Sequence, residues 1–131
     1  MITISDKSRV GVDALIELAS RGAGPPVPIL EVAERRGIAV HALEQVFGAL
    51  RRAGILHSQR GVRGGYSLRR PAEQVTVLDV VEAVDGSLRE AVPPGIWTDA
   101  RAGLVVTLGG RSIADLAEEE ARGASAPMFH I

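Results

Sequence analysis

The sequence contains no cysteine, and this absence excludes several kinds of chemistry. Disulfide bonds, thiolate metal sites, cysteine-held iron–sulfur clusters and thiol redox sensing all need that side chain. The three histidines, His41, His57 and His130, do not have the spacing of metal ligands, and no Walker loop, nucleophile elbow or HExxH sequence is present. We therefore expect no metal, no other cofactor and no enzyme activity.

Aromatic residues and long apolar runs are also scarce. Aromatic residues make up only 3% of the chain, so the core has to be built from Leu, Val, Ile and Ala. No apolar run approaches the roughly 20 residues that span a bilayer, and no signal-peptide pattern is visible. With 46% hydrophobic residues among 131, we expect one packed domain, with or without an appendage, in a soluble cytoplasmic protein that has no membrane partner.

The formal net charge of −1 hides an uneven distribution. Residues 1–70 contain eleven Lys and Arg against six Asp and Glu, a net charge of +5. Residues 71–131 contain four Lys and Arg against ten Asp and Glu, a net charge of −6. Chance clustering of surface charge is one explanation. The other, which the motifs below favour, is that only the first half of the chain contacts nucleic acid.

Residues 50–70 contain six arginines and no acidic residue. Within this segment, three glycines separate two short runs, 55–58 and 66–68, that have the composition of strands. The pattern predicts a β-hairpin with a flexible cationic tip, directly after an amphipathic helix. A helix followed by a basic hairpin is typical of a winged-helix protein that contacts DNA.

Apolar periodicity and capping residues predict the helices. They are expected at 6–20, 29–36, 40–52, 77–84, 97–108 and 112–122. In the second helix Leu30 and Ala33 should face inward, and in the third a stripe of Leu43, Val46, Phe47 and Leu50 should be buried. Because a short turn containing Gly37 joins these two helices, they match the helix-turn-helix signature. The expected fold is therefore mainly α with a small β-hairpin wing.

Several short motifs appear in an order that resembles a known family. They are ISDKSRVGVDALIEL at 4–18, EVAERRG at 31–37, LEQ at 43–45, LRRAG at 50–54, RGxxGGY at 60–66 and IADL at 113–116. This ordered set resembles the Rrf-two family of winged-helix transcription regulators over about residues 2–120. The resemblance implies a homodimer that binds double-stranded DNA at a pseudo-palindromic operator, with repression as the expected action.

The resemblance also implies a dimerisation helix, which would be 97–108. One side of this helix carries Trp97, Ala100, Leu104, Val105 and Leu108. Its low charge suits burial against a second copy, although it could instead pack on its own head. The expected domains are a winged helix-turn-helix head at 1–86, the dimerisation and terminal helices at 87–122, and a flexible tail at 123–131.

In the wing, Arg60 and Arg63 are the strongest candidates for DNA contact, because arginine is favoured in a narrow minor groove. Gly61, Gly64 and Gly65 would let the backbone approach phosphate and adopt positive φ. The alternative is a basic turn that is simply solvated.

In the helices, His41, Glu44 and Gln45 are expected to face the major groove, where Gln can bind adenine and Glu can accept from cytosine. Lys7, Arg9 and Arg52 would contact phosphates. The cations Lys7 and Arg9 oppose the helix dipole, which makes more sense beside DNA. The alternatives are ordinary exposed residues, with Glu44 paired to Arg52 or to a neighbouring arginine.

Two departures from the family pattern separate this chain from the cluster-sensing members. The segment 87–96 is short and has no cysteine where those members carry three, so a cluster sensor is excluded. Ala39, His41 and Ala42 stand where Ser and Tyr are usual, so we expect a different operator.

The controlling signal would then be a small ligand, a protein partner, or nothing. The chain ends in a short apolar run of Met128, Phe129, His130 and Ile131. This run resembles the Ile-ending tails that insert into cysteine synthase, the enzyme that controls a cluster-less member of the family. We hypothesise that the tail docks in that enzyme and links DNA binding to cysteine supply. The alternatives are a disordered or self-packed tail, and a winged-helix module whose main task is protein–protein contact.

Overall fold

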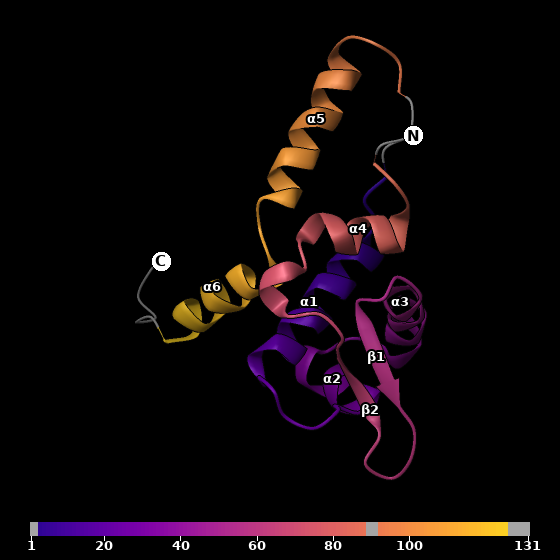
Figure 1. The fold of residues 1–131 in the computed structure, drawn as a ribbon, viewed down its shortest axis with the longest axis vertical. Coiled ribbons are helices and arrows are strands. Elements are labelled where there is room, and N and C mark those ends of the chain that lie inside the picture. The colour runs from indigo at the N-terminus through magenta and orange to yellow at the C-terminus, as the bar shows by residue number, and fades with distance from the viewer. Residues whose placement is uncertain (1–2, 89–91, 126–131) are drawn as a thin grey trace.

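The computed structural model of the protein describes residues 3–88 and 92–125. Its elements follow the order α1 (Asp6–Ser20), α2 (Ile29–Arg36), α3 (Val40–Arg52), β1 (Leu56–Gln59), β2 (Gly65–Leu68), the 3₁₀ helix η1 (Ala72–Gln74), α4 (Val77–Asp85), α5 (Ile96–Gly109) and α6 (Ile113–Ser125). The first four helices and the hairpin form a head. Helix α5 extends from one end of it, and the hairpin points away at the opposite end (Figure 1).

The helices begin and end where the capping residues predict. Ser5 caps α1 by accepting from the Lys7 N–H at 3.2 Å. Gly37 ends α2 in the left-handed conformation, with φ +64°, which glycine adopts without strain. Thr76 and Asp79 form the predicted capping box at the start of α4. Local sequence therefore determines most of the element boundaries.

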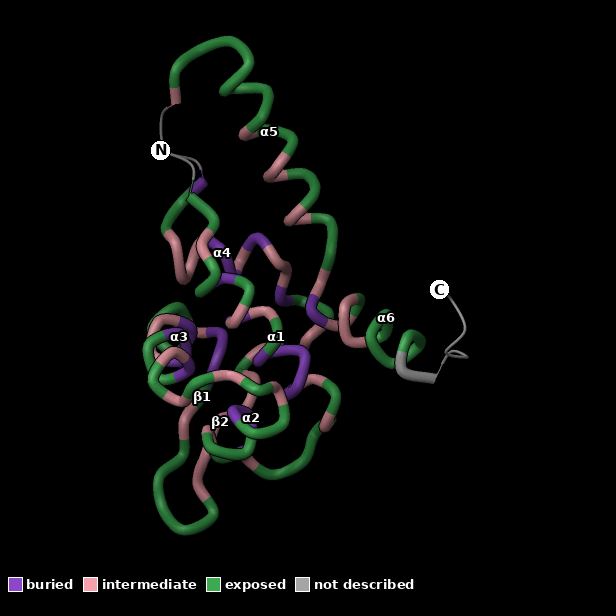
Figure 2. Tube along the Cα trace, turned by 180° about the vertical axis from the view of Figure 1, so that it is seen from behind, coloured by how far each residue is buried: buried purple, intermediate pink, exposed green. Residues whose placement is uncertain are grey.

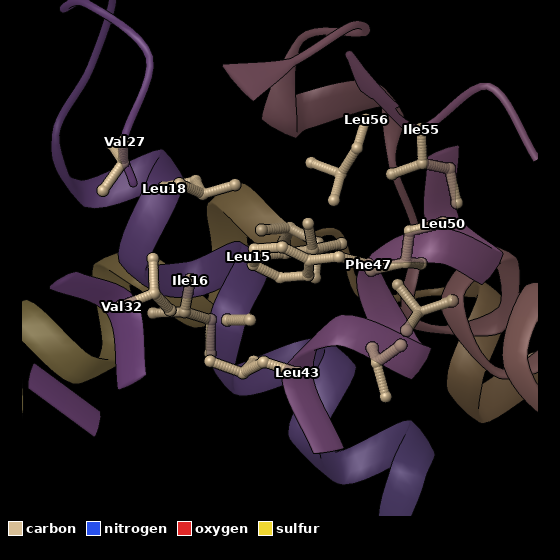
Figure 3. Close-up of a cluster of buried hydrophobic side chains, with 14 of the residues drawn as sticks. Leu15, Ile16, Leu18, Val27, Val32, Leu43, Phe47, Leu50, Ile55 and Leu56 are labelled. Carbon is tan, nitrogen blue, oxygen red and sulfur yellow. The ribbon is translucent and has the colours of Figure 1, made fainter. Parts of the chain in front are cut away.

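The core lies where α1, α2 and α3 meet below the hairpin (Figure 3). The predicted stripe on α3 is confirmed, since Leu43, Val46, Phe47 and Leu50 are all buried. The prediction for α2 was half wrong, because Leu30 is 60% exposed. Val32 is buried beside Ala33 instead, because Ile29, Val32 and Ala33 fall within an arc of about 100° around the helix axis, and Leu30 lies outside that arc.

The strands pair antiparallel in the register Leu56↔Leu68 to Gln59↔Gly65. We call residues 56–68 the wing. Val27, in the loop between α1 and α2, extends the small sheet by exchanging two backbone hydrogen bonds with Tyr66, at 2.9 and 2.8 Å. The Tyr66 ring also packs on Phe47 of α3, with ring centroids 4.7 Å apart. The base of the wing is therefore fixed to the helix that precedes it.

Helix α5 is the least covered element, and none of its residues is buried (Figure 2). Its residues Leu104, Val105 and Leu108 are half-buried against a small cluster of Leu78, Val81 and Leu88. The other apolar side chains of α5 remain open, with Trp97 57% and Val106 74% exposed. Three of the five residues expected at a dimer interface therefore contact their own head.

Helix α6 packs on the head, although the sequence grouped it with the dimerisation helix. Ile113 is fully buried, and its N–H donates to the Val75 carbonyl at 2.8 Å. The predicted start is confirmed by the Ser112–Asp115 capping box. The helix continues to Ser125, past the expected end at Arg122. The hypothesis about Met128 to Ile131 concerns residues outside the described part of the chain.

Candidate nucleic-acid interface

The outer face of α3 presents the three side chains predicted for the major groove. His41, Glu44 and Gln45 are exposed, on the side opposite the buried stripe. The Gln45 amide nitrogen lies 3.5 Å from Nε2 of His41, so the two side chains support each other one turn apart. Within the residues that the structure describes, Glu44 makes no ion pair, so the alternative pairing with Arg52 is wrong.

Arg52 lies on the same face, at the end of the helix. A Cβ placed on Gly48 would come within 3.3 Å of Nη1 of Arg52, which shows that this guanidinium folds back over the glycine. His41, Gln45, Gly48 and Arg52 therefore form one continuous strip along α3. Helical periodicity places all four on this side of α3. Only the conformation of the Arg52 side chain shows that Gly48 gives the guanidinium room.

The tip of the wing exposes Arg60, Gly61, Val62 and Arg63 to solvent. Gly61 has φ +109°, a conformation that residues with a Cβ rarely adopt. Gly64 and Gly65 have a different reason to be glycine. A Cβ on Gly64 would overlap the Gln59 carbonyl oxygen, and a Cβ on Gly65 would overlap the backbone of Val27. These two glycines are required by the packing of the wing itself, whether or not DNA is present.

The arginines of the described residues fall into two groups. Arg21, Arg36, Arg70 and Arg111 make ion pairs or hydrogen bonds with other parts of the molecule. By contrast, no side-chain partner is found in the described part of the chain for a second group on α3 and around the wing, which comprises Arg51, Arg52, Arg60, Arg63 and Arg69. Positive charge that the protein itself does not compensate attracts polyanions.

Lys7 and Arg9 are exposed at the start of α1. Neighbouring carboxylates offset part of the unfavourable interaction between these cations and the helix dipole. Arg9 lies 3.7 Å from the Asp6 carboxylate. Asp85, at the end of α4, accepts hydrogen bonds from the Ser5 N–H and from the hydroxyls of Ser5 and Ser8, at 2.5–2.7 Å. Burial alone would raise the pKa of Asp85, but these hydrogen bonds, helped by the charge of Lys7, hold the pKa below its ordinary value. The helix-dipole argument for phosphate contact is therefore weakened.

A buried carboxylate fixes the position of the helix-turn-helix, and sequence reasoning missed it. The Glu17 side chain is only 7% exposed, and it accepts hydrogen bonds at 3.0 Å from Arg21 and Arg36. Burial would raise the pKa of Glu17, but the two guanidinium groups hold it below the ordinary value. Arg36 continues to Glu120 of α6 through two bonds of 2.7 Å. One network thus joins α1, α2 and α6.

This combination of fold and basic surface agrees with the comparisons with known proteins. The model of the Rrf2 family, described as an iron-dependent transcriptional regulator, matches residues 4–95. The chain belongs to the Rrf2 family. The resemblance drawn from the sequence motifs is therefore confirmed.

Curated relatives include the HTH-type transcriptional regulator IscR of Cronobacter sakazakii, which is 40% identical over 85 residues. The same regulator from Escherichia coli K12 is 39% identical over 85 residues. Both alignments cover 65% of this chain and 52% of the relative, so the chain spans about half the length of the curated relatives it matches. These relatives are regulators and not enzymes, in agreement with the sequence prediction.

Solved structures match over a larger share of the chain. CymR (YrzC), the global cysteine regulator of B. subtilis, superposes with a TM-score of 0.82 at 28% identity, covering 91% of this chain and 98% of that one. IscR of T. potens superposes with a TM-score of 0.80 at 30% identity, covering 98% and 95%. The predicted fold class, winged helix-turn-helix with a two-stranded wing, is confirmed.

The family description names iron, and the residues of this chain do not fit a cysteine-held iron centre. The sequence has no cysteine to supply thiolates. Among the residues that the structure describes, His, Asp and Glu form no group of three or more that could hold a metal ion. In the same residues, no helix is both long and apolar enough to cross a bilayer.

Proposed function

We propose that the protein is a homodimeric, sequence-specific DNA-binding transcription regulator that acts without an iron–sulfur cluster. The observation that carries this proposal is the group of arginines on α3 and around the wing that have no acidic partner among the described residues. Phosphate groups are the partners that such a surface fits, because each arginine that replaces condensed counterions on DNA contributes to affinity. The membership of the Rrf2 family supports the same function.

In this proposal α3 enters the major groove and reads base edges. Gln45 can bind adenine through two hydrogen bonds, and Glu44 can accept from the cytosine amino group. The contact between His41 and Gln45 holds the amide in place before binding, which lowers the entropy lost on recognition. Arg52, folded over Gly48, extends the same strip toward the sugar–phosphate backbone, and Lys7 and Arg9 contact phosphates from α1.

The wing lies along the adjacent minor groove, with Arg60 and Arg63 in the groove. A narrow minor groove has an enhanced negative potential that attracts arginine. Gly61, with its positive φ, provides the tight turn that places Arg60 and Arg63 close together at the tip of the wing.

Two copies associate through α5, the helix with no buried residue in a single chain. A two-fold dimer presents two copies of α3 and therefore matches a pseudo-palindromic operator. Repression is the simplest action for such a protein, because occupying an operator needs no further contact with the transcription machinery.

DNA binding is tested by selecting a preferred site from a randomised 30-bp duplex library and measuring affinity by fluorescence anisotropy across a salt series. Affinity should fall steeply with salt. Arg63→Ala should weaken binding at least about fivefold and reduce the salt slope by about one. Arg122→Ala is the matched control, because it removes an equal charge from α6, and should leave both values within error.

Absence of binding to any duplex at low salt would overturn the proposal. It would favour the other reading of the wing, a module for protein–protein contact whose arginines serve solubility. Equal effects of Arg63→Ala and Arg122→Ala would show that binding depends on general charge rather than on the wing.

For the signal, we propose control by cysteine synthase through the C-terminal residues Met128 to Ile131. The likeness to a structure named a global cysteine regulator supports a link to sulfur metabolism. Deleting residues 129–131 should abolish co-purification with cysteine synthase and leave the melting temperature unchanged. No complex with the full-length protein would end this hypothesis and favour a small-molecule effector.

A further inference from the structure

Val62 lies in the exposed tip of the wing, between the two arginines proposed for the minor groove. Its relative exposure is 105%, so it contacts nothing in its own chain. The other large apolar side chains that the described residues leave open are less exposed; Trp97 and Leu30, for example, are 57% and 60% exposed and lie on helices. A single exposed valine on a surface needs no explanation. Its position between Arg60 and Arg63 does.

The wing presents this tip on a supported base. The Gly64 N–H donates to the Gly61 carbonyl at 3.0 Å, which closes the turn. Behind the turn, the ladder from Gln59↔Gly65 to Leu56↔Leu68 continues into the two bonds between Val27 and Tyr66. Residues 60–63 therefore project beyond the body of the head, and Figure 2 shows the tip as an exposed loop. A groove that receives the side chains of Arg60 and Arg63 must also accommodate Gly61 and Val62 between them.

The minor groove differs chemically between A·T and G·C pairs at the depth that such a tip reaches. A·T pairs present only acceptors there, whereas G·C adds the guanine amino donor. The groove walls include the C–H surfaces of the sugars, and minor-groove proteins combine basic side chains in the groove with apolar side chains that insert between base steps. An apolar group against the guanine amino would leave that donor without water, which is unfavourable.

We propose that Val62 is a specificity-determining residue that favours A·T pairs under the wing. Its methyl groups contact the sugar walls and the floor of the groove while Arg60 and Arg63 are held by the negative potential on either side. This inference rests on the proposed DNA-binding function and assigns it a preference that charge alone does not produce.

The test uses the full chain and three 30-bp duplexes. One is the duplex selected from the random library. In the others, the A·T pairs at the positions protected in the minor groove are replaced by G·C or by inosine·cytosine, which lacks the guanine amino group. The wild-type protein should bind the A·T and inosine duplexes with similar affinity, and the G·C duplex less tightly.

Two substitutions at Val62 separate apolar contact from charge. Val62→Thr keeps the shape and replaces one methyl by a hydroxyl, and Val62→Ala removes both methyls. Each should reduce the affinity ratio between the A·T and G·C duplexes by about three- to tenfold, as expected for one or two buried methyl groups. Neither should change the salt slope, because no phosphate contact is lost. Arg63→Ala is the control that lowers the slope.

The possible outcomes are distinguishable. If the wild-type protein binds the selected duplex but Val62→Thr and Val62→Ala retain its A·T preference, the role of Val62 is overturned and the proposed function stands. Equal wild-type affinity for the A·T and G·C duplexes would likewise overturn the role of Val62 and leave the proposed function standing. If no duplex is bound at low salt, the proposed function fails and this inference fails with it. Because Val62 contacts nothing in its own chain, the variants should keep the wild-type melting temperature. An unchanged melting temperature would exclude misfolding as the cause of a lost A·T preference.

Discussion

At the scale of single residues, the Glu17 carboxylate connects several elements of the head. Its carboxylate accepts hydrogen bonds from Arg21, directly after α1, and from Arg36 of α2. Arg36 also binds α6. A carboxylate removed from water in this way contributes to stability only while both of its partners are present. The geometry of the helix-turn-helix thus depends on a residue that is not itself proposed to contact DNA.

Replacing Glu17 by Gln should lower the free energy of unfolding by about 2 kcal/mol at pH 7, the range for hydrogen bonds to a charged group. Glu118→Gln is the matched control. It removes an exposed carboxylate 3.8 Å from Arg122 and should cost less than about 0.5 kcal/mol. Urea denaturation measures both, and a Glu17 variant as stable as the control would contradict the role assigned to the network.

The pH dependence follows from the lowered pKa of Glu17. Because the folded state binds this proton less readily than the unfolded state, the carboxylate contributes its full stability above its ordinary pKa. The contribution is lost as the pH falls through the lower folded-state value. The stability difference between wild type and Glu17→Gln should therefore be constant from pH 7 to about 5 and shrink below that. A difference that grows on acidification would reverse the sign and refute the assignment.

At the scale of elements, α5 uses its two sides differently. Leu104, Val105 and Leu108 face α4. The opposite side carries Ile96, Gly103 and Val106, all exposed, and the small Gly103 would let another helix approach closely. The sequence predicted an apolar helix, but the apolar residues of α5 are distributed around nearly its whole circumference. Only packing decides which side is covered by the same chain.

Val106→Arg should therefore break the proposed homodimer without unfolding the head. A buried valine is worth about 1.5 kcal/mol and a symmetric interface counts it twice, so the dissociation constant should rise roughly a hundredfold. Sedimentation equilibrium measures this change, with far-UV circular dichroism to confirm helix content. Leu30→Arg, at an exposed leucine of α2, is the control and should leave the dimer intact. A dimer of unchanged affinity in Val106→Arg would place the interface elsewhere.

At the scale of the whole molecule, α5 and the wing tip point in opposite directions from the head (Figure 1). Most of this arrangement follows from local patterns. Caps such as Ser5 and Thr76 and the stripe on α3 place the helices within a residue or two, and the glycines of RGxxGGY predict the hairpin.

The parts that could not be predicted are contacts between residues far apart in the chain. Ser5 and Asp85 are 80 positions apart, and Arg36 and Glu120 are 84 apart. No periodicity links such pairs. The same limit applies to the candidate site. The sequence named the wing arginines, but only the structure shows which of them have partners, that Gly65 is required by Val27, and that Val62 is fully exposed.

The position of α6 against α1 has a consequence for biosynthesis. The first helix emerges from the ribosome early, yet the side chains that complete its surroundings, Ile113 and Glu120, are made only after α5. Contacts of such long sequence separation form late and slow the search for the native state. A nascent chain that ends after α4 has the residues proposed to contact DNA but lacks Ile113 and Glu120. We therefore expect the head to mature only after α6 has been made, so a product truncated after α4 should compete poorly for the proposed operator.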